Sequence, residues 1–337
     1  MRHERTNAAQ ALAPEQAAWP SLSTAAGPRE LSEVLTGLAS QPRRLPCKLL
    51  YDARGSELFE CITQLPEYYC TRVELGILRE HAHDMAREIG PDSLLLELGS
   101  GSSRKTRLLL DQLVRPQVYV PIDISPSALE ASVRSLRRRY PELEVRPLVA
   151  DYTQSLQLPL ESLASGRAQG KLVWFFPGST IGNFEPVAAV DFLRRLRTQR
   201  AGPQHWLIGV DTPKSRAILE AAYDDARGVT AAFNLNLLQV LNRRCAANFV
   251  REGFCHRALW RPEEGRVEMH LVSRYRQTVR VAQHTLQLEE GEAIVTEHCY
   301  KYEPEAFGRL VREAGFEVER VWLDPQRRFS VHLLRSV

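Results

Sequence analysis

The chain has 337 residues, of which 44% are apolar and 25% charged, a composition typical of a soluble globular protein with a substantial core. The formal net charge of +3 is small for this length, so nothing implies a nucleic-acid partner. The six cysteines show no paired metal-ligand spacing, so we expect reduced thiols and no bound metal. Since no apolar run spans a membrane and no signal-peptide core is present, we expect a cytoplasmic protein without membrane contact.

The first 72 residues precede any strand pattern. Residues 1–29 are rich in Ala, Pro, Gln, Ser and Thr without a sustained period, which predicts a disordered tail. Helical spacing follows at residues 31–38 and again at 56–62. The segment 65–72 then places two tyrosines after a proline, which suggests a pocket wall or lid. A plain cap for the next helix, expected at 75–89, is the alternative.

An apolar strand at residues 94–98 turns through a glycine-rich loop into a helix that begins near Lys105. Gly99 and Gly101 allow backbone angles and close approaches that a Cβ would block. A phosphate-binding loop and a dinucleotide fingerprint would both need a further glycine where this chain has Arg104. The remaining pattern, Glu97-x-Gly-x-Gly, suits S-adenosylmethionine (SAM), which has no phosphates. An ordinary strand-to-helix turn stays open as the alternative.

Strands and helices continue to alternate, which predicts a doubly wound parallel sheet. Two further strands end in acids, Asp123 and Asp151. Asp123 lies near the spacing at which an acid meets ribose hydroxyls in such folds. Together with Glu97 these acids indicate an adenosyl ligand. The strands are expected at 94–98, 118–123, 145–149, 172–176 and 206–210, with helices at 127–140 and 186–196.

The second half of the chain interrupts this strand–helix alternation and then supplies the last elements of the sheet. Residues 212–298 read as an inserted α+β unit that is largely helical over 217–241 and strand-like afterwards. A helix to Ala314, then two strands at 317–322 and 329–334, close the chain. This closing hairpin is how class I methyltransferases finish their sheet, and it favours the methyl-donor interpretation.

With these blocks the chain resembles the histidine Nα-methyltransferases of ergothioneine biosynthesis, over roughly residues 45–335. The blocks that carry the resemblance are 50–59, 65–72, 99–106, 119–125, 178–183 and 296–297. The resemblance implies five parts: a tail at 1–29, an N-terminal segment at 30–72, a SAM-binding core at 73–211, an inserted substrate-binding unit at 212–298, and a completion of the core at 299–337.

The resemblance also implies roles for single residues. Asp123 would meet the ribose of the methyl donor and Lys105 its carboxylate, while Asn183, Tyr68 and Tyr223 would hold the amino-acid end of the acceptor. The residues expected around the donor are Phe59, Glu97, Gly99, Gly101, Lys105, Asp123, Asp151, Tyr152, Gly178 and Ser179. Those expected around the acceptor are Tyr68, Asn183, Tyr223, Met269, Glu297 and Cys299, with Tyr51 and Asn183 as the catalytic pair.

Specificity is expected to depend on Glu297, whose carboxylate would accept an N–H bond from the imidazole. Cys299 departs from the family pattern, because the histidine enzymes carry serine two residues after this glutamate. A thiol is a weak donor and acceptor, so the change bears on substrate identity. His298 is expected to point away, since neighbours on a strand face opposite sides.

We therefore expect a monomeric SAM-dependent enzyme that trimethylates the α-amine of histidine, with SAM as methyl donor and no metal. Tyr51 or water would take the proton before each transfer. A methyltransferase for another amino acid or amine is the alternative within the family. A non-catalytic SAM-binding sensor, an NTPase and a nicotinamide oxidoreductase are the alternatives outside it.

Overall fold

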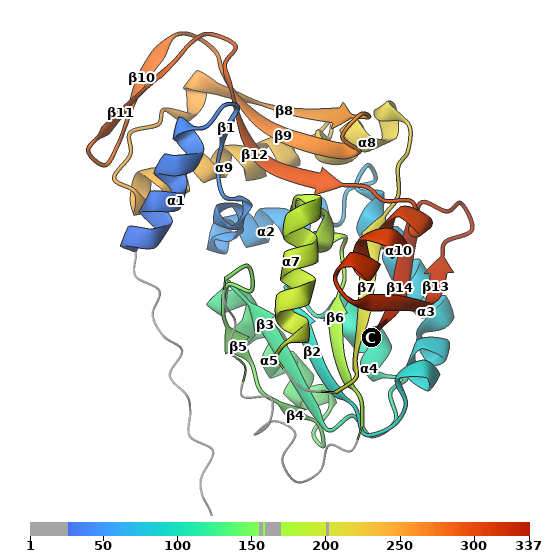
Figure 1. Ribbon diagram of the computed structural model, residues 1–337. Helices are drawn as coiled ribbons and strands as arrows, with labels where there is room; N and C mark the ends of the chain where they lie inside the picture. Colours follow the sequence, from blue (N-terminus) through green and yellow to red (C-terminus); the bar gives the residue numbers. More distant parts are fainter. Residues whose placement is uncertain (1–25, 155–157, 159–169, 200–201) are drawn as a thin grey trace, which may run out of the picture.

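The computed structural model describes residues 26–154, 158, 170–199 and 202–337, and the proposed tail lies almost wholly outside them. Pro28 and Arg29, which the sequence assigned to that tail, form the first turn of helix α1 (Pro28–Ala39). The described residues form two main sheets and a two-stranded hairpin. A large sheet occupies the lower half of Figure 1, and a smaller one lies above it.

The large sheet has the order β13-β14-β7-β6-β2-β3-β4, with β5 also paired to β3. Strands β2, β3, β6 and β7 are parallel, whereas β14 is antiparallel to both β7 and β13. The predicted doubly wound sheet with its closing hairpin is therefore confirmed. The strands are β2 (Leu94–Leu98), β3 (Val118–Asp123), β4 (Glu144–Val145), β5 (Leu148–Val149), β6 (Leu172–Phe176), β7 (Gln204–Asp211), β13 (Phe316–Leu323) and β14 (Phe329–Ser336).

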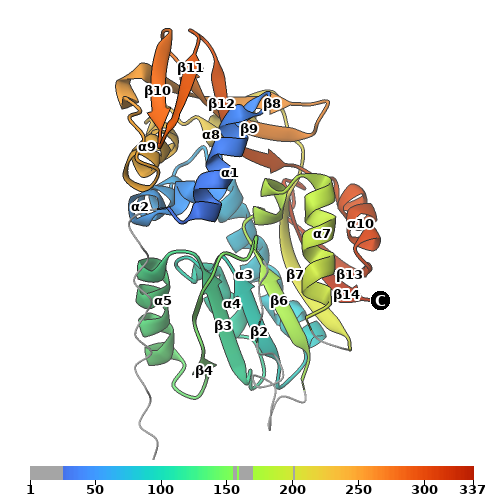
Figure 2. The same cartoon turned by 60° about the vertical axis from the view of Figure 1, so that its left-hand side comes forward.

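Helices cover both faces of this sheet, because successive residues of its buried strands are apolar on either side. On β2, Leu95 packs with α3 (Tyr69–Ile89), α4 (Arg104–Leu110) and α5 (Pro126–Arg139). Its neighbours Leu94 and Leu96 pack with the opposite pair of helices, which are α7 (Pro186–Arg197) and α10 (Pro304–Glu313). Figure 2 shows these two helical layers on either side of the strands.

The segment expected as an inserted unit consists of two helices followed by antiparallel strands, of which β8, β9 and β12 share one sheet while β10 and β11 form a separate hairpin. Its elements are α8 (Arg216–Tyr223), α9 (Val229–Arg244), η3 (Arg251–Gly253), β8 (Phe254–Arg261), β9 (Arg266–Ser273), β10 (Gln277–Val281), β11 (His284–Leu288) and β12 (Ala293–Tyr300). The N-terminal segment packs on this unit through β1 (Arg43–Arg44), which pairs with β12, and through η1 (Cys47–Tyr51) and α2 (Ala53–Ile62), which contact α9.

The larger differences from the sequence prediction concern four parts of the chain, while other boundaries move by one or two residues. Helix α3 begins at Tyr69 instead of near Leu75, because Tyr69 and Cys70 are buried against the core. The third strand is split into β4 and β5, since Pro147 has no N–H to give to the ladder. The helical stretch after residue 216 breaks before α9, whose first amides are capped by Asp225. Strand β12 runs on to Tyr300.

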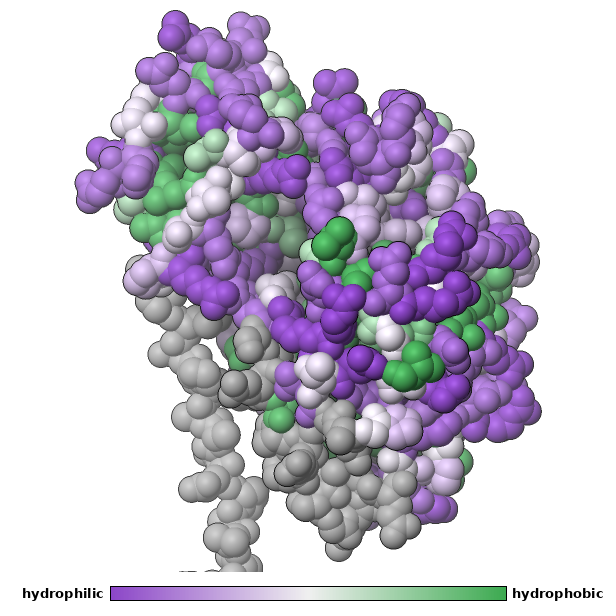
Figure 3. Space-filling model, viewed as in Figure 1, coloured by the Kyte–Doolittle hydropathy of each residue, from purple (hydrophilic) through white to green (hydrophobic). Residues whose placement is uncertain are grey.

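Polar residues cover most of the face seen in Figure 3, with apolar residues in small groups. Among the described residues, no helix combines the length and apolar character needed to cross a membrane. The six cysteines are unpaired.

Candidate active site

A pocket lies where the loop after β6 meets the inserted unit and the N-terminal segment, with about 470 Å³ of space that includes the solvent at its opening. It gathers every residue that the sequence proposed for the acceptor, together with three of those proposed for the donor. From the sequence prediction it is lined by Tyr51, Phe59, Tyr68, Gly178, Ser179, Asn183, Tyr223, Met269, Glu297 and Cys299. Sequence reasoning missed Ile62, Thr180, Ala222, Thr230 and Phe233, which also line it.

Glu297 places a buried carboxylate in this pocket. The register between β12 and β9 shifts between Val295 and Glu297, and both Glu297 and Cys299 face the pocket. His298 between them faces the other way, where its Nδ1 lies 2.8 Å from a Glu185 oxygen. Glu297 is 8% exposed and its Oε2 has no hydrogen-bond partner. Burial raises the pKa of Glu297 to about 7, against a lowering by the charge of Lys301.

Asn183 reaches the pocket from η2 (Thr180–Asn183), the single turn that follows β6. Gly182 lets this turn approach β12, because a Cβ there would lie 2.6 Å from the Tyr300 carbonyl oxygen. Ser179, in the left-handed region with φ of 60°, accepts a hydrogen bond from the Asp211 amide at 3.0 Å. The loop after β6 is thus tied to the end of β7, which fixes where Asn183 lies.

Aromatic rings form one wall of the pocket and come from three separate parts of the chain. Tyr51 packs edge-on against Phe59 and Phe233, each with ring centroids 5.5 Å away. Tyr68 continues the wall between Phe59 and Tyr223 at 6.1 and 6.2 Å. Burial raises the pKa of Tyr51 well above its ordinary value, so its hydroxyl is neutral at physiological pH.

The glycine loop after β2 forms a cradle beside the β3 end. Gly99 and Gly101 have φ of +70° and +46°, and a Cβ on Gly101 would meet only open space. Asp123, at the end of β3, accepts hydrogen bonds of 2.9 Å from the amides of Gly101 and Ser125. Each carboxylate oxygen keeps a further lone pair, so the residues fit a ribose whose hydroxyls bind Asp123.

Lys105 lies between this cradle and the pocket that Glu297 lines, next to Gly178. Its Nζ is 2.6 Å from an oxygen of Glu74, which is 1% exposed and also accepts the Gly178 amide at 2.9 Å. A Cβ on Gly178 would lie 3.1 Å from that Nζ. Since an ammonium has three donors, Lys105 can still bind the carboxylate of a ligand placed here.

Asp151 and Tyr152 follow β5 at the other side of the cradle. Asp151 forms an ion pair with Lys48 at 3.1 Å, and Tyr152 packs against Phe176 and lies near Gly99. Burial would raise the pKa of Asp151, but hydrogen bonds from Thr153 and the charge of Lys48 hold it below its ordinary value. This side of the cradle combines an ionised acceptor with an aromatic face.

Glu97 lies deeper than the sequence pattern suggests. It is 1% exposed within β2, where its Oε2 accepts hydrogen bonds from Thr106 at 2.6 Å and from the Tyr119 hydroxyl. Burial raises the pKa of Glu97 to about 8. These contacts tie the strand to the first turn of α4, so Glu97 supports the glycine loop from beneath.

Comparison of the sequence with protein families identifies the family of this chain. The model of a family described as "histidine-specific methyltransferase, SAM-dependent" matches residues 30–336. The chain belongs to this family. The resemblance noted from the sequence is thereby confirmed, and the chain is a SAM-dependent methyltransferase.

Relatives within this methyltransferase family match almost the whole chain. A histidine N-alpha-methyltransferase of Mycolicibacterium smegmatis is 38% identical, over 89% of this chain and 93% of its own length. Its counterpart in Mycobacterium tuberculosis is 39% identical over the same shares. Ergothioneine biosynthesis protein 1 of Neurospora crassa is 33% identical over 87% of this chain, which spans only 33% of that longer protein.

Proposed function

We propose that this methyltransferase converts the α-amine of L-histidine to the trimethylated betaine, hercynine, as the first step of ergothioneine biosynthesis. The observation that carries the proposal is the Glu297 carboxylate, which is buried in the pocket with one oxygen unpaired. A buried acceptor without a partner is costly, so it calls for a ligand N–H, and an imidazole supplies one. The names of the two mycobacterial relatives support the same substrate.

The remaining lining residues suit the amino-acid end of histidine. Asn183 offers both a donor and an acceptor, and the hydroxyls of Tyr68 and Tyr223 lie on the same wall. Met269 gives an adaptable apolar side to the ring. In this proposal Cys299 lies beside the imidazole and contributes a weaker hydrogen bond than a hydroxyl would.

The reaction needs little acid–base machinery from the protein. SAM supplies an electrophilic methyl group on its sulfonium, and the attacking amine must be neutral and in line with the methyl–sulfur bond. The protein positions the amine and shields it from water. Because Tyr51 is neutral, we propose that it acts as a relay, accepting a proton from the amine while passing its own toward water.

Calorimetric titration of histidine into the protein with S-adenosylhomocysteine, with mass spectrometry of a parallel turnover with SAM, tests the proposal. We expect binding and a product heavier by three methyl groups. Firm binding of S-adenosylhomocysteine without histidine binding would discard the substrate and favour another amino acid or amine, for which Cys299 is the distinguishing feature. Binding of both without turnover would favour the non-catalytic sensor.

A monomeric state and a cytoplasmic location belong to the same proposal. The exposed large apolar residues of the described chain come from separate elements: Val114, Val187, Ile218, Val250, Tyr275 and Val337. Scattered single residues of this kind do not make an interface. The six unpaired cysteines support a reducing compartment. Light scattering of the purified protein at the mass of one chain tests the first point, and a larger mass would contradict it.

A further inference from the structure

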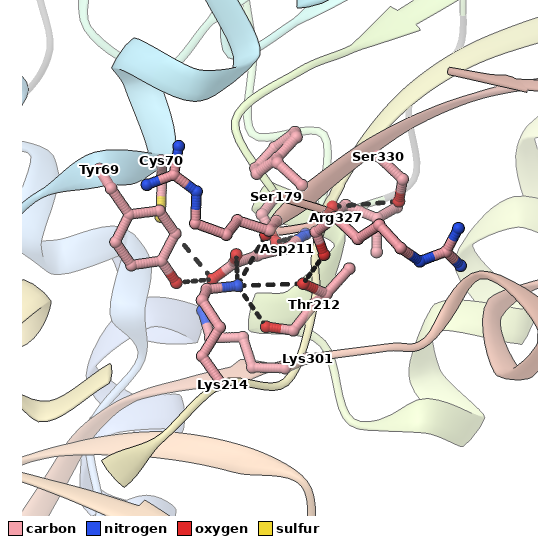
Figure 4. A network of polar contacts seen from close by, with 12 residues as sticks. Tyr69, Cys70, Ser179, Asp211, Thr212, Lys214, Lys301, Arg327 and Ser330 are labelled. Carbon is pink, nitrogen blue, oxygen red and sulfur yellow. Dashed lines mark hydrogen bonds and ion pairs between the residues drawn. The ribbon is translucent and has the colours of Figure 1, made fainter. Parts of the chain in front are cut away.

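A buried ion-pair cluster lies beneath the acceptor pocket and has no part in the function proposed above. Asp211, at the end of β7, accepts from Lys301 at 2.9 Å on Oδ2 and from Lys214 at 2.7 Å on Oδ1. Figure 4 shows the cluster, in which Tyr69 and Cys70 also approach Asp211. The side chains of Asp211 and Lys301 are 0% exposed. Because the desolvation cost of a buried ion pair can exceed the gain from its attraction, stability alone does not explain this cluster.

Lys301 keeps its proton in this setting. Burial alone would lower the pKa of Lys301, but the charge of Asp211 holds it well above its ordinary value. The neighbouring Cys70 and Cys299 thiols stay neutral, because burial raises the pKa of both. Lys301 is therefore a cation whose ammonium group can donate three hydrogen bonds and accept none.

Each of those three hydrogens has one acceptor. The Lys301 Nζ lies 2.9 Å from Asp211 Oδ2, 2.8 Å from Tyr223 Oη and 3.1 Å from Cys299 Sγ. Since an ammonium can only donate, the Tyr223 oxygen must accept in this pair. The single hydrogen of the Tyr223 hydroxyl is then left for another acceptor, and Tyr223 lines the pocket.

In the pocket without ligand, the neighbour that can take this hydrogen is the Cys299 sulfur. Sulfur is a weak acceptor, and this one already receives a bond from Lys301. A ligand carboxylate would accept the hydrogen far more strongly. A ligand ammonium has no lone pair and could not accept it. The arrangement thus makes the Tyr223 hydroxyl a donor for a carboxylate.

The backbone of Tyr223 is held as firmly as its hydroxyl. The Tyr223 carbonyl oxygen lies 2.8 Å from Nε2 of His256, and the Asn234 amide nitrogen lies 2.9 Å from Nδ1 of the same ring. Asn234 also donates to the His270 carbonyl through that nitrogen, so Nδ1 of His256 accepts and Nε2 donates. Tyr223 therefore has little freedom to turn its hydroxyl elsewhere.

We infer that Lys301 is a positioning residue that fixes the Tyr223 hydroxyl as the hydrogen-bond donor to the carboxylate of the acceptor. Asp211 holds Lys301 in place for this purpose. The inference rests on the proposed function, because it concerns an amino-acid acceptor in this pocket. It goes further in assigning the selection for a free carboxylate to a residue that never touches the substrate.

A comparison of histidine with histamine tests whether Tyr223 binds the carboxylate, because histamine keeps the imidazole and the amine but lacks the carboxylate. Their affinities would be measured in the presence of S-adenosylhomocysteine, histamine by competition. We expect Tyr223→Phe to weaken histidine binding about tenfold or more while changing histamine binding by less than about threefold, since a bond to a charged group is lost. Equal weakening of both ligands would show that Tyr223 meets the amine and would overturn the inference.

Lys301→Met completes a double-mutant cycle with Tyr223→Phe. If Lys301 acts through Tyr223, Lys301→Met should weaken histidine binding in the wild-type background and add little in the Tyr223→Phe background. Independent, additive losses would mean a merely structural role. If Lys301→Met does not fold, because it leaves Asp211 unpaired, Lys301→Arg takes its place in the cycle, since it keeps a positive charge beside Asp211 but changes the donor that faces Tyr223. Wild-type protein that binds no histidine would instead defeat the proposed function itself.

Discussion

At the scale of single residues, the pocket combines a carboxyl group whose pKa is raised by burial with a hydroxyl group that keeps its proton. Glu297 is buried with a pKa of about 7, and Tyr51 is half-buried and neutral. The unpaired oxygen of Glu297 serves a ligand more than the stability of the empty protein. Two expected outcomes follow from these two side chains.

Replacing Glu297 by Gln is expected to stabilise the ligand-free protein at high pH. A carboxyl with a pKa near 7 when folded and 4.5 when unfolded binds its proton more tightly in the folded chain. Stability is therefore lost as pH rises from about 4.5 to about 7, by at most about 3 kcal/mol. The Tm of Glu297→Gln should exceed that of wild type at pH 8 and match it more closely at pH 5.

The matched control is Glu263→Gln, which changes an exposed glutamate on the turn between β8 and β9. It should leave the Tm difference unchanged between the two pH values. A Glu297→Gln variant whose Tm difference from wild type does not grow with pH would show that the carboxylate has a partner when the pocket is empty.

Tyr51→Phe is expected to lower kcat for histidine by about tenfold to a hundredfold at neutral pH, because the relay hydroxyl is lost while the ring packing against Phe59 and Phe233 remains. Affinity for S-adenosylhomocysteine should be unchanged. Rates equal to wild type across the pH range would remove Tyr51 from the proton path and leave water as the acceptor.

At the scale of elements, Asp52 joins the N-terminal segment to the inserted unit. It caps α2 by accepting the Gly55 amide at 2.8 Å, and it also binds Asn236 at 2.8 Å and Arg243 at 2.6 Å on α9. Since α2 and η1 carry Phe59 and Tyr51, this one carboxylate holds the aromatic wall against the helix behind it.

Asp52→Ala should therefore lower the free energy of unfolding by about 2 kcal/mol, the sum of a lost cap and lost polar bonds. Glu57→Ala is the control in the same helix, because Glu57 is 69% exposed and pairs only with exposed Arg54. Denaturant unfolding of both variants measures the difference. Equal effects would mean that the cap contributes nothing.

Local patterns allowed much of this architecture to be predicted. The apolar run of β2 and the closing hairpin of β13 and β14 each carry their signal within a few residues. The early start of α3 at Tyr69 carries no such signal, since it depends on burial against β7. Similarly, the resemblance supplied Glu297 and Tyr223, but neither it nor any local pattern pointed to Lys301. A lysine just after a strand gives no sign that it will be buried against an aspartate 90 residues earlier.

At the scale of the whole molecule, the N-terminal segment bridges the two sheets. Lys48 on η1 pairs with Glu33 of α1 at 2.6 Å and with Asp151 of the core at 3.1 Å. This is a contact between the part that lines the acceptor pocket and the part expected around adenine. Its position suggests that the two parts are held together before any ligand binds.

Lys48→Met should increase hydrogen exchange in residues 28–51, because the tie to Asp151 is lost and Glu33 loses its 2.6 Å ion pair with Lys48. Arg29→Ala serves as control, since Arg29 is 78% exposed and approaches the same Glu33 only at 3.7 Å. Mass spectrometry of exchanged peptides reports the change. Unaltered exchange in Lys48→Met would show that packing of α1 and η1 on the inserted unit suffices.

The pairing of Asp211 with Lys301 has a consequence for how the chain accommodates its insertion. The insertion leaves the core after Asp211 and returns at Tyr302, whose amide donates to the Asp211 carbonyl at 3.0 Å. Exit and return are therefore neighbours, fastened by both backbone and side chain. The intervening 90 or so residues thus leave the core and rejoin it at the same place. Changes of length within this segment, for example in the β10–β11 hairpin, should leave the core strands in register. The insertion that lines the pocket can thus change while the strands of the core keep their geometry.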